Sequence, residues 1–157
     1  MHPIHPCAPA RPQQGIMLIE ALIGILIFSI GILAMIGLQA VSIKSQADAK
    51  YRSEASYLAN QIISNMWVDR ANLATYQHRA TGGGAGCTPT GADSPQAGTA
   101  GSNMAIWLAA VTANLPGAAS DNQQIIVGAG NQVTVTVCWK GPQETSWHNY
   151  LVTTFVN

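Results

Sequence analysis

One uncharged segment constrains this chain more than any other feature of its sequence. Residues 21–43 contain no acidic or basic side chain, and their polar residues are Ser29, Gln39 and Ser42. A helix needs about 20 apolar residues to cross the hydrocarbon core of a bilayer. A helix that is apolar on every side is unusual in the core of so small a domain. The segment therefore predicts a membrane-spanning helix, and Glu20 stands at its edge.

The residues before this segment decide which kind of membrane signal it is. Residues 1–15 hold prolines at positions 3, 6, 9 and 12, so no regular helix is expected there. A secretory signal peptide has its apolar core before the cleavage site. Here the expected processing point, after Gly15, precedes the apolar core. Cleavage at that point would leave the apolar segment as the new N-terminus, beginning at Ile16.

Charge is scarce throughout the chain. Charged residues make up 9% of the sequence, apolar residues 48%, and the formal net charge is zero. Such a chain has no overall positive field with which to recruit nucleic acid. Its apolar residues are concentrated in residues 16–43, and the rest is a polar sequence rich in Gly, Thr and Asn. The composition predicts one small domain attached to an apolar segment.

The helix is expected to continue beyond the apolar segment. No proline occurs from residue 16 to about residue 72. In the second part of this stretch apolar residues recur at helical spacing, which gives one apolar stripe. The stripe consists of Tyr51, Ala55, Leu58, Ile62 and Met66. The pattern predicts one helix over residues 16–72 that is apolar all round at first and amphipathic later.

The remainder predicts a loop, a short helix and three strands. Residues 81–102 are rich in Gly, Ser, Thr and Pro, which is typical of a loop. A second helical stripe follows and ends at Pro116-Gly117. Its members are Met104, Trp107, Leu108, Val111 and Leu115. Strands are expected at 123–127, 132–140 and 149–156, and the turn at 128–131 would join the first two as a hairpin.

The middle strand indicates how these elements pack. Its apolar residues alternate, so they share one face of the sheet, namely Val133, Val135, Val137 and Trp139. This face is expected to pack on the amphipathic half of the long helix. The predicted class is α+β, with a long N-terminal helix packed by its C-terminal half on a small antiparallel sheet of three or four strands.

Cysteine positions suggest one disulfide. The chain has three cysteines, Cys7, Cys87 and Cys138, and removal of residues 1–15 would leave two. An even number is expected of a disulfide-bonded protein in an oxidising compartment. A Cys87–Cys138 bond would also help to order the Gly-rich loop. The alternative is that both are unpaired small apolar residues.

Residues that could carry chemistry do not combine into a site. His2, His5 and Cys7 could ligate a metal, but they lie in the expected leader. The Gly-rich run 82–86 lacks the strand, helix and lysine of a phosphate-binding loop. No catalytic pair or nucleophile emerges, so the sequence predicts a non-enzyme without metal or cofactor. Trp147, next to Gly141-Pro142, is the best candidate for an exposed contact residue.

The stretch Gly15-Ile16-Met17-Leu18-Ile19-Glu20, followed by an uncharged run, resembles the class III signal of type IV pilins. In that family a prepilin peptidase cuts after the glycine and methylates the new N-terminal residue. A glutamate five residues into the mature chain is read during filament assembly. The resemblance implies that Gly15 precedes the cut, that Ile16 is methylated and that Glu20 acts in assembly. The other interpretation is an ordinary single-pass anchor with an interfacial glutamate.

Within this family the chain is most similar to minor pilins of the PilV type, the type IV pilus modification proteins. The similarity rests on "IMLIEALIGILIFSIGILAMIGLQ" and on "WLAAVTANLPG" before a "VTVTVCW" strand. It implies a lollipop-like pilin with three parts. Residues 1–15 are the cleaved leader, 16–44 the membrane and filament-core helix, and 45–157 a periplasmic or extracellular head.

The resemblance also implies a cellular role. A minor pilin is held in the bacterial inner membrane as a single-pass prepilin and then enters the pilus at the cell surface, where it supports assembly, adhesion or twitching motility. Its partners are the prepilin peptidase, the inner membrane and other minor and major pilins. A minor pseudopilin of a type II secretion system would carry the same N-terminal signal. A DNA-uptake pilin would need a basic stripe, but after the long helix the head offers only Arg79 and Lys140, so this role is the least favoured.

Overall fold

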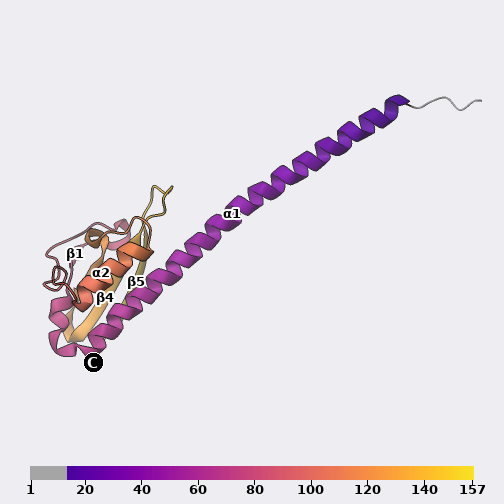
Figure 1. Ribbon diagram of the computed structural model, residues 1–157. Helices are drawn as coiled ribbons and strands as arrows, with labels where there is room; N and C mark the ends of the chain where they lie inside the picture. The colour runs from indigo at the N-terminus through magenta and orange to yellow at the C-terminus, as the bar shows by residue number, and fades with distance from the viewer. Residues whose placement is uncertain (1–13) are drawn as a thin grey trace, which may run out of the picture. The chain divides into compact units, whose positions relative to one another are not determined.

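The structure, a computed structural model, describes residues 14–157, apart from the side chains of Gln14 and Ala85. Helix α1 spans Gln14–Val68 (Figure 1). The chain divides into two units, one that ends at Gln46 and one that comprises Ala47–Asn157. The first unit contains the apolar part of α1, and the second contains the amphipathic part and all later elements. The expected α+β class is confirmed.

The second unit is built on a three-stranded antiparallel sheet. Strands β3 (Gln124–Val127), β4 (Gln132–Trp139) and β5 (His148–Phe155) are hydrogen-bonded in the order β3-β4-β5. The expected strands are confirmed within one residue at each end. The short 3-10 helix η4 (Ala129–Asn131) makes the β3–β4 turn, where Gly130 has φ +67°. This is the left-handed region that glycine adopts most readily.

Helix α2 (Asn103–Asn114) occupies the position that the second apolar stripe predicts. Its N-terminus is capped by Ser102, whose hydroxyl oxygen accepts a hydrogen bond from the Ala105 backbone N–H at 3.1 Å. After α2 the chain turns at Pro116 and Gly117. The Pro116 carbonyl accepts a hydrogen bond from Lys140 N–H at 2.9 Å, so the end of the helix is fixed to the end of β4.

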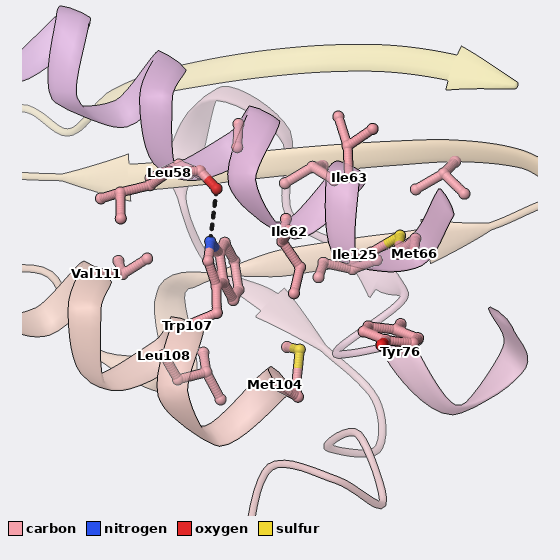
Figure 2. Close-up of a cluster of buried hydrophobic side chains, with 14 of the residues drawn as sticks. Leu58, Ile62, Ile63, Met66, Tyr76, Met104, Trp107, Leu108, Val111 and Ile125 are labelled. Carbon is pink, nitrogen blue, oxygen red and sulfur yellow. Dashed lines mark hydrogen bonds between the residues drawn. The ribbon is translucent and has the colours of Figure 1, made fainter. Parts of the chain in front are cut away.

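The core of the second unit lies on the valine face of the sheet. Val133, Val135, Val137 and Trp139 are all fully buried, as the alternation predicts. They share one hydrophobic cluster with the buried residues of the α1 and α2 stripes. Figure 2 shows part of this cluster, in which Leu58 and Ile62 of α1 face Trp107 of α2. Burial of a large aliphatic or aromatic side chain contributes roughly 1.5–3 kcal/mol relative to exposure. The predicted packing of the sheet on the amphipathic part of α1 is therefore confirmed.

Helix α1 ends earlier than the sequence suggests. The expected end was near residue 72, but α1 stops at Val68 and is followed by the 3-10 helix η1 (Arg70–Tyr76). Asp69 leaves the helical region with φ −111° and ψ 44°. The change of direction allows Leu73 and Tyr76 to enter the core, where both are buried. Absence of proline alone could not reveal this tertiary requirement.

The Gly-rich segment contains more structure than a loop. Strands β1 (Thr81–Gly82) and β2 (Pro89–Thr90) form a small antiparallel ladder around the 3-10 turn η2 (Gly84–Gly86). A further 3-10 turn, η3 (Ser120–Asn122), precedes β3. These short elements carry little apolar periodicity, so sequence pattern does not reveal them.

Candidate assembly helix and disulfide-linked loop

The apolar part of α1 exposes its side chains along its full length. From Ile16 to Ile43 every residue is exposed, including aliphatic residues on all sides of the helix. This helix is long and apolar enough to cross a membrane, and no residue in its most apolar stretch of 18 residues is buried. An exposed apolar surface of this extent requires lipid or protein around it.

Glu20 lies near the start of this surface. It is exposed, and it stands four residues after Ile16 on the same helix. Residues four apart lie one above the other on a single face, about 6 Å apart along the axis. The carboxylate is therefore on the same face as Ile16, with exposed Ile19 and Ile23 close to it in sequence.

Ser29, one of the polar residues inside the apolar segment, is compatible with an apolar environment. The Ser29 hydroxyl donates a hydrogen bond to the Ile25 carbonyl one turn earlier, at 2.7 Å. Such a bond satisfies the hydroxyl without water. The space beside Gly24 and Gly31 is open within the chain. These two positions are one heptad apart, so they lie on nearly the same face, where a second helix could approach closely.

The Gly-rich loop is joined to the sheet by a disulfide between Cys87 and Cys138, the pair expected from the sequence. Their Cα atoms are 5.9 Å apart, and the bond closes a sequence separation of 51 residues. Cys87 follows η2 in a left-handed conformation with φ 52°. Both cysteines are buried, so the bond is protected from solvent.

Gln123 secures the same region, and sequence reasoning did not single it out. It is fully buried immediately before β3. Its side-chain oxygen accepts a hydrogen bond from Cys138 N–H at 2.9 Å, and its amide nitrogen donates to the Cys138 carbonyl at 3.1 Å. The side chain thus pairs with the backbone of β4 as a neighbouring strand would. The only indication of this role in the sequence is that a glutamine begins the strand expected at residues 123–127.

His78 is fully buried and hydrogen-bonded. Its Nδ1 accepts a hydrogen bond from the Ser94 backbone N–H, and its Nε2 lies 3.1 Å from the Ser120 carbonyl oxygen. Since a backbone N–H can only donate and a carbonyl can only accept, the proton belongs on Nε2. His78 therefore joins two segments that are distant in sequence.

Trp147 is less accessible than the sequence suggests. It is partly buried, and the Lys140 ammonium lies 6.0 Å from its ring centroid. Trp67, near the end of α1, is more exposed at 45%. A role for Trp147 in a surface contact stays a prediction.

Groups able to bind a metal are not clustered in the part of the chain that the structure describes. His2, His5 and Cys7 lie outside that part.

His148 stacks on Trp139, with ring centroids 5.6 Å apart. Its Nε2 atom lies 2.7 Å from a carboxylate oxygen of Glu144.

Comparisons with protein-family models, curated proteins and solved structures return no match to this chain. Its function is therefore inferred from its own residues.

Proposed function

We propose that this protein is a minor type IV pilin of the PilV type. It is held in the bacterial inner membrane as a prepilin, is cut between Gly15 and Ile16, and enters the pilus through the apolar part of α1. There it supports assembly and hence adhesion or twitching motility. Its partners are the prepilin peptidase and other minor and major pilins, which it contacts through the N-terminal helix.

One observation carries this proposal: a carboxylate stands one helical turn after the expected new N-terminus, on a helix whose apolar surface is exposed all round. A carboxylate in an apolar environment is costly and requires a partner. Cleavage after Gly15 creates a cationic amine at Ile16. When two such helices lie side by side, the amine of one can pair with Glu20 of the other, so association is favoured over isolation in lipid.

A minor pseudopilin of a type II secretion system is the second candidate, because it would use the same helix and the same carboxylate. The order of "LPG" and "VTVTVCW" in the head and the Cys87–Cys138 disulfide favour the pilus. The two candidates differ in where the protein accumulates, which is in sheared surface filaments for a pilin and in the cell envelope for a pseudopilin.

The test compares Glu20→Ala and Glu20→Gln with the wild-type chain in cells that make pili. Glu20→Gln keeps the size of the side chain and removes its charge. We expect both variants to be cut and inserted normally but to be depleted in sheared pili relative to the membrane fraction. Glu54→Gln, the same change later on α1, is the control and should enter pili normally. Wild-type amounts of Glu20→Gln in sheared pili would overturn the proposed role.

A further inference from the structure

Strand β5 forms one edge of the three-stranded sheet, and this edge is open. Within the part of the chain that the structure describes, β5 pairs with β4 alone, through eight consecutive residue pairs without a bulge. Residues 148–156 contain no proline and none of Asp, Glu, Lys or Arg. Edge strands are normally protected by charge, proline, a bulge or a covering segment, because an open edge can pair with another chain.

The chain protects the opposite edge with its own residues. Strand β3 has four residues, and Ile125 exchanges two backbone hydrogen bonds with His78, at 2.9 and 3.0 Å. The Gln124 side chain donates to the carbonyl oxygens of Arg79 and Gly82. Among the described residues, the sheet thus has one short edge that the chain covers and one eight-residue edge, β5, that lacks a further strand partner. The acidic side chains of Glu144 and Asp48 lie against His148, the first residue of β5, and leave the edge from Leu151 to Phe155 unprotected by charge.

The outward face of the second half of β5, from Leu151 to Phe155, exposes two large apolar side chains. Leu151 and Phe155 are 55% and 53% exposed, and Thr153 lies exposed between them on the same face. The Thr153 hydroxyl is 3.0 Å from that of Thr134 on β4. Two large apolar side chains on an unprotected edge form a surface that favours coverage by another strand.

The spacing of these three residues identifies the covering strand. When two copies of β5 run antiparallel around a two-fold axis at Thr153, each Leu151 lies opposite Phe155 of the other copy, and the two Thr153 residues face each other. Apolar residues then meet apolar residues, and a Thr–Thr pair is a favourable cross-strand pair. In a two-fold interface the same surface of both copies meets, so a charged strand would meet like charges of its own copy. Strand β5 contains no Asp, Glu, Lys or Arg, so no such repulsion opposes the pairing.

We propose that β5 is a self-association surface, at which two copies of this chain join their sheets edge to edge in the register centred on Thr153. The inference depends on the second unit and does not require the proposed function. It predicts a single contact geometry, which cysteine crosslinking can test. Directly opposite residues in an antiparallel pair have Cβ atoms about 4.5–5.5 Å apart.

The crosslinking experiment uses the full chain in detergent, with Cys7→Ser as the background. Thr153→Cys places two thiols directly opposite each other, so mild oxidation should give a disulfide-linked dimer. In Leu151→Cys the two thiols would be four residues out of register, about 14 Å apart along the strands, so this variant should remain uncrosslinked. Equal crosslinking of both variants, or none with Thr153→Cys, would overturn the proposed register.

A second measurement tests association without added cysteines. Leu151→Lys replaces the apolar contact with Phe155 of the other copy by a charged side chain and should weaken dimerisation at least about tenfold in sedimentation experiments on the full chain. Ile106→Lys is the matched control, since Ile106 is 57% exposed and belongs to α2 rather than to the sheet. Equal effects of the two substitutions, or a wild-type chain that stays monomeric at every concentration, would overturn the proposal. Circular dichroism of each variant verifies that it is folded.

Discussion

The indole Nε1 of Trp107 in α2 donates a hydrogen bond to the carbonyl oxygen of Leu58 in α1, at 2.9 Å (Figure 2). Both residues are almost completely buried. The bond joins the amphipathic part of the long helix to a helix 49 residues later in the chain. The two residues belong to the same unit, Ala47–Asn157, whose core therefore includes its own section of α1.

This arrangement predicts that residues 45–157 fold without the apolar segment. The stripe of α1 in this fragment is covered by the sheet and by α2, whereas residues 16–43 have exposed side chains. We expect a soluble product with mixed α and β circular dichroism and a cooperative thermal transition. Size-exclusion chromatography and circular dichroism measure this outcome. An aggregated or unfolded fragment under oxidising conditions would show that the two parts are not separable.

Trp107→Phe should destabilise the second unit. The substitution removes the hydrogen bond to Leu58 and leaves space in a fully packed region, which together cost about 2–3 kcal/mol of unfolding free energy. Trp67→Phe is the control, because Trp67 is 45% exposed and a change there should stay within about 0.5 kcal/mol. Urea denaturation of fragment 45–157 measures both effects. Similar losses for the two variants would contradict the structural role of Trp107.

The disulfide should contribute much of the stability of the Gly-rich loop. Replacing both Cys87 and Cys138 by Ala removes a cross-link that spans 51 residues. The entropy of the closed loop gives a loss of roughly 4 kcal/mol, reduced by any strain that is released when the bond is removed. Alkylation without reduction, followed by mass spectrometry, should find no free thiol at either position of the wild-type protein. Two alkylated cysteines, or an unchanged denaturation midpoint in the variant, would refute the prediction.

The raised pKa of Tyr76 predicts that the protein loses stability at alkaline pH. Burial raises the pKa of its hydroxyl, as does the charge of nearby Asp69, while the hydrogen bond donated by Asn103 opposes the rise. The folded protein holds this proton more tightly than the unfolded chain. The resulting stabilisation is therefore complete below about pH 10 and is lost as the pH rises through the folded-state pKa.

The measurement compares unfolding free energies at pH 8 and pH 11. Tyr76→Phe should lower the value at pH 8, since it removes hydrogen bonds to Asp69 and Asn103, but its further decline toward pH 11 should be smaller than that of the wild type. Tyr57→Phe changes a tyrosine that is 62% exposed and should keep the wild-type decline. Parallel pH profiles for all three proteins would contradict the assignment.

Periodic features of the sequence predicted the main elements. The stripe from Tyr51 to Met66, the α2 stripe and the alternation of Val133 to Trp139 each come from one segment, so local spacing was sufficient. The Cys87–Cys138 pairing could also be predicted from the sequence, because the chain has only three cysteines and Cys7 lies in the expected leader.

Features that depend on distant partners were not predictable. Gln123 acts on Cys138, and His78 acts on Ser94 and Ser120, so neither role is visible in the local sequence. The end of α1 at Val68 depends on the burial of Tyr76. The open edge of β5 could not be identified without the order of the strands in the sheet, and the spacing of residues along the sequence does not determine that order.

Mass spectrometry of the mature N-terminus tests the central claim most directly. The protein is extracted from the membrane and pilus fractions of cells that contain a prepilin peptidase. We expect a chain that begins at Ile16, with fifteen residues removed and one methyl group added to the terminal amine. A chain that retains Met1, or one cut beyond residue 40, would contradict the assignment as a pilin.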